Sequence, residues 1–273
     1  VCSSDLLDTP NTSYIMGIVD EEKFLAHVYY GEKISDHRAG YLLRTQEGPF
    51  VPSVNNRDRI AFLDSFPMEY AAHGIGDCRE SCISIRTLGG NTALSLNYVS
   101  HEIKRGKAPF GEMPASFGRE NECSVLEILC EDSVTGLQMI LQYGVFEDVD
   151  VITRSIRVVN QGTEDIYLTK VYSACLDMDN REFESITLHG SWARERHIQS
   201  LPLSRMKHTV ESLRGETSHQ DHPFMALKTP GTTQETGEVY AMHFVYSGNF
   251  RVQVQTDPYE QIRMVMGINP EDF

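Results

Sequence analysis

Short runs of β-branched and aromatic residues recur along almost the whole chain, and clusters of Gly, Pro, Asn and Asp separate them. Runs of this kind are typical of β-strands that are joined by turns. We predict strands at residues 14–19, 25–30, 83–87, 94–103, 125–130, 137–146, 151–159, 166–175, 186–192, 210–213, 239–246, 251–255 and 262–268. No segment carries an apolar stripe with a helical period over three turns, so residues 35–43 and 69–75 form short helical turns at most.

The spacing of these runs also predicts the fold class. Strands that follow one another with turns every ~8–12 residues favour antiparallel sheets that pack as a large sandwich or barrel. A chain of 273 residues can bury a sizeable core without help from disulfides or metals. No linker, repeat or low-complexity tract interrupts residues 7–273, which we interpret as one all-β, antiparallel domain.

Both ends of the chain look cut. Residues 1–6 (VCSSDL) have no starting Met, and they read like the translation of a sequencing-library adapter, so they are excluded from the fold prediction. At the other end, residues 267–273 follow a strand-like run and include no polar tail. We therefore expect a domain that is truncated at both ends.

The charge of the chain excludes some classes of partner. Lys and Arg number 24 against 39 Asp and Glu, which gives a net charge of −15. Such a chain repels phosphate backbones and anionic lipid headgroups, so neither nucleic acid nor a membrane is an expected partner. The six cysteines show no framework of short, regular spacings, which favours reduced thiols and a cytoplasmic location.

Residues 192–197 (WARERH) contain the one Trp of the chain. Trp192 could stack on a sugar ring while Arg194, Glu195 and Arg196 bind the sugar hydroxyls. The same residues also fit an ion-pair cluster at a strand end, with Trp192 packed in the core. The burial tendencies of these residue types favour the second interpretation.

Two other polar segments carry groups that could do chemistry. In residues 214–224 (RGETSHQDHPF), His219 and His222 lie three positions apart, with Asp221 beside His222. A zinc site takes three or four protein ligands, so we expect no metal here, and a loop whose polar side chains bind its own backbone. Residues 64–79 combine several carboxylates with Arg79, and paired carboxylates are typical of glycosidases. With 39 acidic residues in the chain, two in one loop are weak evidence. No phosphate loop, dinucleotide fingerprint or nucleophile elbow occurs, so we expect no cofactor.

Eight segments nevertheless occur in an order that resembles one family. They are residues 14–17, 25–31, 69–79, 151–155, 190–196, 218–224, 246–250 and 267–270 (YIMG, LAHVYYG, EYAAHGIGDCR, VITRS, GSWARER, SHQDHPF, YSGNF and GINP). Together they are similar to the N-terminal domain of glycoside hydrolase family 36 α-galactosidases. The similarity runs from about residue 12 to the last residue.

The resemblance implies a two-sheet β-supersandwich that precedes a (β/α)₈ catalytic barrel and a C-terminal β domain. It implies retaining hydrolysis of terminal α-1,6-linked galactose from melibiose and raffinose-type sugars. Both catalytic aspartates of the family lie in the barrel, so no residue of this chain inherits a catalytic role, and the chain alone is expected to be inactive. The implied partners are galactosides, the barrel, and other subunits of a homotetramer.

In tetrameric members, a loop of this domain reaches the sugar pocket of a neighbouring subunit. Its acidic residue and its arginine correspond to Glu47 and Arg59, counted without gaps from Tyr29 to Tyr70. A carboxylate accepts hydroxyl protons and a guanidinium donates to sugar oxygens, although two exposed charges in a solvated loop explain these residues equally well. A second hypothesis is an independent carbohydrate-binding module, with Trp192 or a Tyr cluster as its sugar platform.

Overall fold

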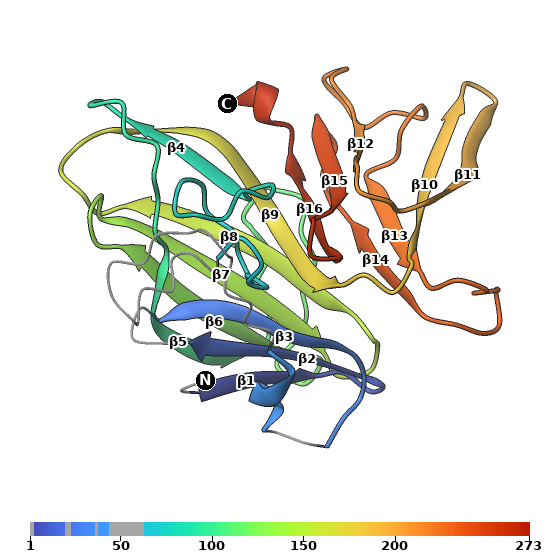
Figure 1. Cartoon of the computed structure of the whole chain (residues 1–273), viewed down its shortest axis with the longest axis horizontal. Coiled ribbons are helices and arrows are strands. Elements are labelled where there is room, and N and C mark those ends of the chain that lie inside the picture. Colours follow the sequence, from blue (N-terminus) through green and yellow to red (C-terminus); the bar gives the residue numbers. More distant parts are fainter. Residues whose placement is uncertain (1–2, 20–22, 36–37, 44–62) are drawn as a thin grey trace. The chain divides into compact units, whose positions relative to one another are not determined.

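The computed structural model describes residues 3–19, 23–35, 38–43 and 63–273, and strands dominate it (Figure 1). The strand pairs are antiparallel, so the prediction of an all-β chain built from antiparallel sheets is confirmed. The chain divides into two compact units, Val1–Leu168 and Thr169–Phe273. Among the described residues, no helix is long and apolar enough to cross a membrane.

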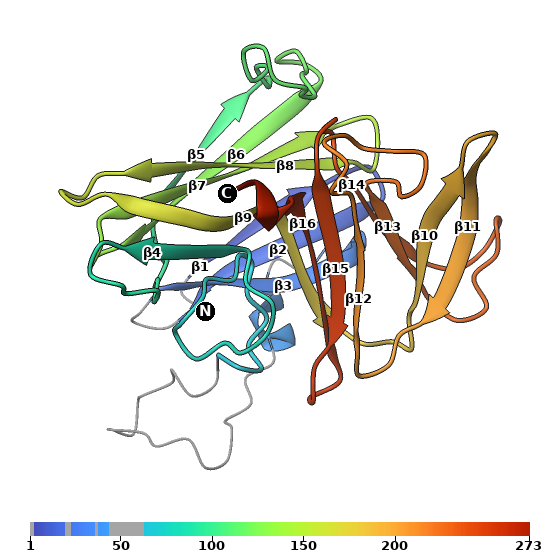
Figure 2. The same cartoon turned by 90° about the horizontal axis from the view of Figure 1, so that it is seen from above.

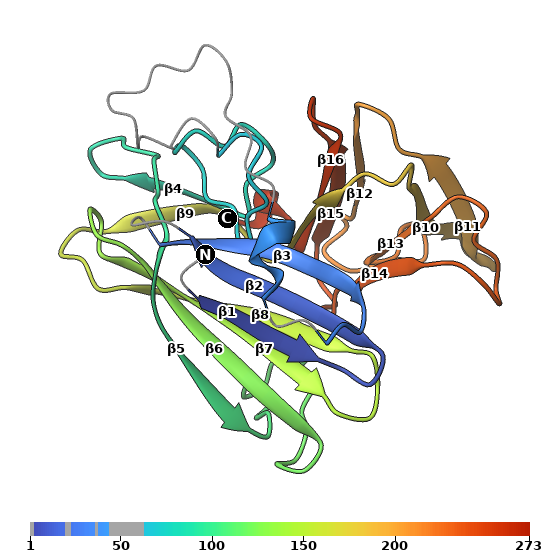
Figure 3. The same ribbon diagram turned by 60° about the horizontal axis from the view of Figure 1, so that its bottom comes forward.

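The first unit contains two sheets, with the orders β1-β2-β3 and β5-β6-β7-β8. Their strands are β1 (Ser3–Asp8), β2 (Thr12–Val19), β3 (Phe24–Glu32), β5 (Asn97–Arg105), β6 (Cys123–Asp132), β7 (Leu137–Phe146) and β8 (Ile152–Asn160). Figure 3 shows them as two neighbouring layers, one blue and one green. A short 3₁₀ turn, η1 (Ala39–Leu42), follows β3, and β4 (Ile83–Thr87) follows a long loop.

Alternating side chains place a core between these two sheets. Along β7 the buried positions include Met139, Leu141 and Tyr143, two residues apart, as one face of a strand requires. The Tyr143 ring lies 6.3 Å from the ring of Tyr14 on β2. The inner faces of the two sheets therefore meet, and the first unit is a sandwich.

The second unit also contains two groups of paired strands, in the orders β12-β15-β16-β9 and β11-β10-β13-β14. Their bounds are β9 (Ile166–Asp179), β10 (Glu184–Ser191), β11 (Arg194–Pro202), β12 (Lys207–Glu211), β13 (Phe224–Lys228), β14 (Val239–His243), β15 (Phe250–Thr256) and β16 (Gln261–Ile268), with a final 3₁₀ turn, η3 (Pro270–Asp272). Figure 2 shows β10 and β11 side by side.

Strand β16 is buried almost throughout, including the charged Arg263. The Arg263 guanidinium donates two parallel hydrogen bonds to Asp177, from Nε to Oδ1 at 2.7 Å and from Nη2 to Oδ2 at 2.6 Å. A buried charge of this kind needs a paired and hydrogen-bonded partner. The pair therefore allows an arginine to lie inside the second unit.

Several details differ from the sequence predictions. Residues 69–75 form no helical turn, and strands β1, β11 and β13 were not predicted. Strand β11 is exposed along nearly its whole length, so its sequence lacks the apolar alternation that marks a half-buried strand. The division between the compact units falls inside β9, which explains why no linker composition marks it. The prediction that residues 7–273 form one domain stays a prediction.

Candidate functional site

A polar pocket of about 510 Å³ opens in the second unit. It lies between the β10–β11 hairpin and the loop of residues 217–223, which we call the histidine loop. The lining residues are Glu195, Arg196, Thr217, Ser218, His219, His222 and Pro223. The pocket therefore unites two segments that the sequence analysis considered separately, residues 192–197 and residues 214–224.

The hairpin side of the pocket has an unusual backbone. Ala193 and Arg196 have φ angles of +60° and +59°, in the left-handed region that non-glycine residues rarely adopt. The Glu195 carboxylate accepts a hydrogen bond of 2.9 Å from the backbone N–H of Ala193, which holds the turn. A Cβ atom on Gly190 would lie 2.3 Å from the carbonyl oxygen of Arg194 and 3.0 Å from that of His219. Glycine at this position therefore permits the close approach of the hairpin and the histidine loop.

Backbone and side-chain bonds attach the histidine loop to β10. The Gly190 N–H donates to the carbonyl of Gln220 at 3.0 Å, and the His222 N–H donates to the carbonyl of Leu188 at 3.1 Å. The His189 Nδ1 lies 2.7 Å from Oδ1 of Asp221. Because a carboxylate only accepts, this distance places a proton on Nδ1. Asp221 thus serves to hold the loop against the strand.

Three nitrogen-bearing side chains of the pocket keep their hydrogen-bonding capacity. Within the described part of the chain, no hydrogen bond or ion pair engages the Arg196 guanidinium or the rings of His219 and His222. Burial lowers the pKa of His222, and the nearby Arg196 and His243 lower it further, against an opposing effect of Asp221. His222 is therefore neutral at neutral pH, with one ring nitrogen that donates and one that accepts.

The histidines do not complete a metal site among the described residues. His219 and His222 both line the pocket, but Asp221 bonds to His189. No group of three His, Cys, Asp or Glu side chains in the described ranges is arranged to hold a metal ion. The pocket is therefore better suited to binding through hydrogen bonds than to holding zinc, which takes at least three protein ligands.

Trp192 lies outside the core. Its side chain is 83% exposed, because it follows the last residue of β10 at the turn of the hairpin. The interpretation of this residue as a packed core tryptophan is therefore wrong. The ion-pair cluster is also not formed within the described residues, where Glu195 instead bonds to the backbone of Ala193. Trp192 is not one of the residues that line the pocket.

The remaining site residues predicted from the sequence are Glu47, Arg59 and the carboxylates of residues 64–79. Glu47 and Arg59 lie outside the described residues. In the loop of residues 64–79, Asp77 forms a buried ion pair with Arg79, with 2.9 Å between Oδ1 and Nε. Asp64 accepts a hydrogen bond of 3.3 Å from the backbone N–H of Cys78. These two carboxylates therefore organise the loop, through the backbone N–H of Cys78 and the guanidinium of Arg79.

Glu69 is a buried carboxylate of the first unit, and it belongs to the segment of residues 64–79. The sequence reasoning noted the carboxylates of that segment but missed the buried role of Glu69. Glu69 accepts hydrogen bonds from the hydroxyls of Tyr14 and Tyr143, both at 2.7 Å, and from the Arg154 guanidinium at 2.5 Å. Its other oxygen lies 3.2 Å from Nδ1 of His27. Burial raises the pKa of both tyrosines well above the usual value. The residue pattern that could have identified this cluster is a Glu beside apolar residues in a loop, with Tyr and Arg on the inner faces of strands.

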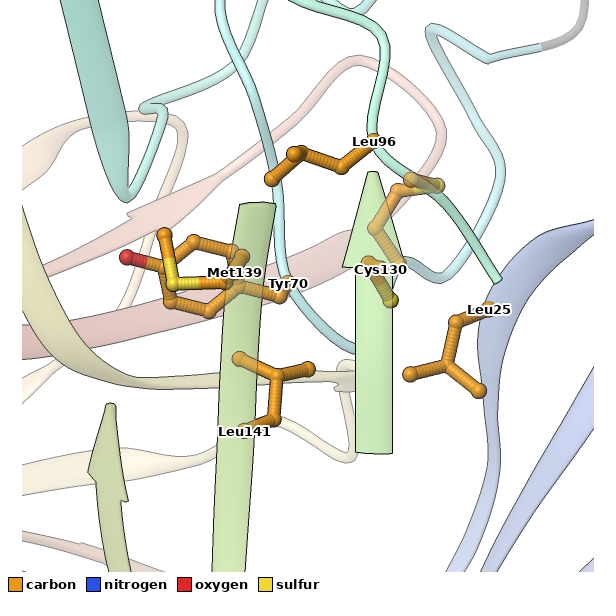
Figure 4. A pocket seen from close by; sticks show the side chains of 7 residues that line it. Leu25, Tyr70, Leu96, Cys130, Met139 and Leu141 are labelled. Atoms are coloured by element: carbon orange, nitrogen blue, oxygen red, sulfur yellow. The ribbon is translucent and has the colours of Figure 1, made fainter. Parts of the chain in front are cut away.

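The cavity of the first unit drawn in Figure 4 is too small for a sugar. Leu25, Met68, Tyr70, Leu96, Cys130, Met139 and Leu141 line it, and its volume is about 10 Å³. A space of this size holds one water molecule at most. Among the described residues, the pocket in the second unit is therefore the stronger candidate for a ligand site.

Comparison with known protein families identifies the family to which this fold belongs. Residues 23–273 match the family model described as the glycosyl hydrolase family 36 N-terminal domain. The chain belongs to this family. Two curated proteins are similar to the chain. The α-galactosidase AgaA of Geobacillus stearothermophilus is 38% identical over 96% of this chain, and the bifunctional α-galactosidase/sucrose kinase AgaSK of Mediterraneibacter gnavus is 38% identical over 98%.

Solved family 36 structures share the fold over nearly the whole chain. A variant of Geobacillus stearothermophilus AgaA in complex with raffinose superposes with a TM-score of 0.94 at 37% identity and covers 99% of this chain. The galactosidase domain of AgaSK gives the same TM-score and identity. This chain spans only 36% of the AgaA sequence and 29% of the AgaSK sequence. It therefore corresponds to one part of those longer proteins.

Proposed function

We propose that this chain is the N-terminal domain of an α-galactosidase that releases terminal α-D-galactosyl residues from melibiose and raffinose-type sugars with retention of configuration. The observation that carries the proposal is the TM-score of 0.94, at 37% identity, to an α-galactosidase in complex with raffinose. The chain covers 38% of that protein, so the activity belongs to the longer polypeptide.

Within that enzyme, the chain acts as a scaffold for a catalytic barrel that supplies both reacting carboxylates. Retaining glycosidases hold two carboxyl groups about 5–5.5 Å apart. The pocket of the second unit is lined by a single carboxylate, that of Glu195. Its Oε1 already accepts a hydrogen bond from the hairpin backbone. This arrangement supports a binding or supporting role for the chain and an inactive isolated domain.

The proposal includes assembly and location. The parent enzyme is a homotetramer in the cytoplasm, and Glu47 and Arg59 narrow the sugar pocket of a neighbouring subunit. The support for these two residues is their chemistry, since a carboxylate and a guanidinium together satisfy sugar hydroxyls as acceptor and donor. The cytoplasmic location is supported by the sparse, irregularly spaced cysteines of the sequence.

Hydrolysis of a chromogenic α-galactoside tests the proposed activity. We expect the complete open reading frame that contains this chain to hydrolyse the substrate and to release galactose from melibiose and raffinose. The 273-residue chain by itself is expected to show no turnover. An inactive complete protein would refute the α-galactosidase assignment, and turnover by the isolated chain would refute the placement of the catalytic carboxylates in the barrel.

Steady-state kinetics of the complete enzyme test the role of Arg59. We expect Arg59→Ala to raise KM for raffinose by about tenfold, because a charged hydrogen bond to substrate is lost. Trp192→Phe serves as the control and should change KM less than about twofold, because Trp192 lies outside the proposed subunit pocket. Equal effects of the two substitutions would remove Arg59 from the sugar pocket.

An independent carbohydrate-binding module is the second candidate function, and the exposure of Trp192 favours it. A ring that is 83% exposed is available for stacking on a sugar face. A reading frame that stops near Phe273, together with galactose binding by the chain that Trp192→Ala abolishes, would establish the module. A frame that continues into a barrel would exclude it.

A further inference from the structure

The lining of the pocket in the second unit contains both hydrogen-bond donors and hydrogen-bond acceptors. The Arg196 guanidinium only donates, whereas the neutral His222 ring can donate and accept. Ser218 Oγ accepts from the backbone N–H of Gln220 at 3.1 Å, which leaves its own proton free to donate. Glu195 uses Oε1 for the hairpin turn and presents an acceptor-only carboxylate at the pocket wall. A ligand must therefore supply both donors and acceptors to match this lining.

The lining of the pocket disfavours three simpler classes of ligand, namely anions, cations and apolar molecules. An anion would meet the Glu195 carboxylate, and a cation would meet the Arg196 guanidinium, since both side chains line the same pocket. An apolar ligand would remove several polar groups from water without replacing their hydrogen bonds, which costs free energy. A neutral ligand with many hydroxyl groups avoids all three penalties, because each hydroxyl both donates and accepts.

The size and construction of the pocket agree with this class of ligand. Its volume of about 510 Å³ falls within the ~300–1,000 Å³ of small-molecule sites, large enough for one or two sugar rings. The walls are held in place by the close approach at Gly190 and by the bonds from β10 to the histidine loop. These contacts fix the backbone that carries the pocket-facing groups, while the side chains of Arg196, His219 and His222 keep their capacity for new hydrogen bonds.

We propose that the pocket between the β10–β11 hairpin and the histidine loop binds a glycosyl unit through its hydroxyl groups. The site is a binding site without catalysis, and it is separate from the exposed Trp192 ring. The choice of a neutral polyhydroxylated ligand rests on the pocket itself. The choice of a galactoside among such ligands rests on the proposed function.

Histidine signals in NMR spectra of the 273-residue chain test the proposal directly. Raffinose is expected to shift the imidazole signals of His219 and His222 in a saturable manner. The signals of His101, an exposed residue of β5 in the first unit, should stay unchanged. The absence of any saturable shift at His219 and His222 would overturn the proposal. A saturable shift with sodium sulfate and none with raffinose would also overturn it, because the site would then bind an anion.

Two matched arginine variants sharpen the test. Arg196→Gln should weaken raffinose binding at least about tenfold, because a charged donor that lines the pocket is lost. Arg194→Gln should leave the affinity unchanged, because Arg194 is exposed on the same strand but does not line the pocket. Both arginine side chains are exposed, so neither substitution is expected to unfold the chain. Circular dichroism spectra of the two variants check this. Equal affinities of the two variants, or loss of binding only in Trp192→Ala, would overturn the pocket as the binding site.

This test is independent of the hydrolysis assay. Saturable shifts in a chain whose complete protein has no α-galactosidase activity would support the sugar pocket and refute the proposed function. Activity of the complete protein without shifts would support the function and overturn the pocket.

Discussion

His222 shows how the pocket sets the ionisation of a single residue. Burial removes water from the ring, and the positive charge of Arg196 further disfavours a proton on it. The unfolded chain lacks both effects, so it binds the proton more readily than the folded chain. As the pH falls below about 6.5, the usual histidine pKa, this residue therefore favours unfolding, and above that pH it has no effect on stability.

The pKa of His222 provides a prediction at this scale. We expect His222 to titrate below the usual histidine value in NMR spectra of the wild-type chain. Arg196→Gln should raise the pKa of His222 part of the way back, because burial, the larger cause, remains. Arg194→Gln should leave it unchanged, since that residue is not among the causes of the shift. A lower pKa of His222 in Arg196→Gln would contradict the assigned electrostatics.

At the scale of the element, sequence reasoning succeeds where a strand carries a long apolar or alternating run. Strands β7 and β16 carry apolar runs that predict them, and β11 and β13 do not stand out. Strand β11 is polar because it is exposed, and β13 is a run of five residues directly after a polar loop. Periodicity alone does not assign a short apolar run to a strand, because a buried helix segment gives the same pattern.

The candidate site could be predicted only in pieces. The sequence identifies residues 192–197 and residues 214–224 as two polar segments whose side chains could bind a ligand. That they line one pocket depends on β10, which pairs with β11 and also bonds to the histidine loop through Gly190. Such a contact between distant segments is set by tertiary structure, which local pattern does not report. The position of Trp192 was mispredicted for a related reason, because burial tendencies of a residue type do not identify a hairpin turn.

Gly190 carries the prediction at the scale of the element. Gly190→Ala should destabilise the chain by about 1–3 kcal/mol, because the new Cβ meets backbone atoms of the hairpin that cannot move aside easily. The same variant should weaken raffinose binding by displacing the hairpin from the histidine loop. Gly89→Ala is the control, since a Cβ there meets only one side-chain atom at 3.9 Å. Equal unfolding midpoints of the two variants in urea would show that the close approach at Gly190 does not contribute to the stability of the chain.

At the scale of the whole molecule, each compact unit contains its own buried charged group. Glu69 lies in the first unit among Tyr14, Tyr143 and Arg154, and Asp177 lies in the second unit with Arg263. Breaking a buried ion pair leaves an uncompensated charge, which typically costs about 3–5 kcal/mol. An exposed pair contributes little, about 0–1 kcal/mol, because water screens it.

Urea unfolding of single and double variants tests this division. Glu69→Gln and Asp177→Asn should each lower the free energy of unfolding by about 3–5 kcal/mol. Glu147→Gln, which removes an exposed pair with Arg105, should lower it by less than about 1 kcal/mol. The effects of Glu69→Gln and Asp177→Asn should add within about 0.5 kcal/mol, since the two residues belong to different compact units. A larger coupling would show that the two buried groups depend on each other.

The outer strand β11 has a consequence for self-association. A strand at the border of a sheet presents backbone amides and carbonyls that can recruit a strand from another molecule. In β11, Arg194, Glu195, Arg196 and His197 occupy this border in succession, and Pro202, which lacks an amide proton, ends it. Charged side chains and a terminal proline are the means by which natural sheets discourage fibril growth. The polarity that conceals this strand in a hydropathy pattern thus also serves as a safeguard against aggregation.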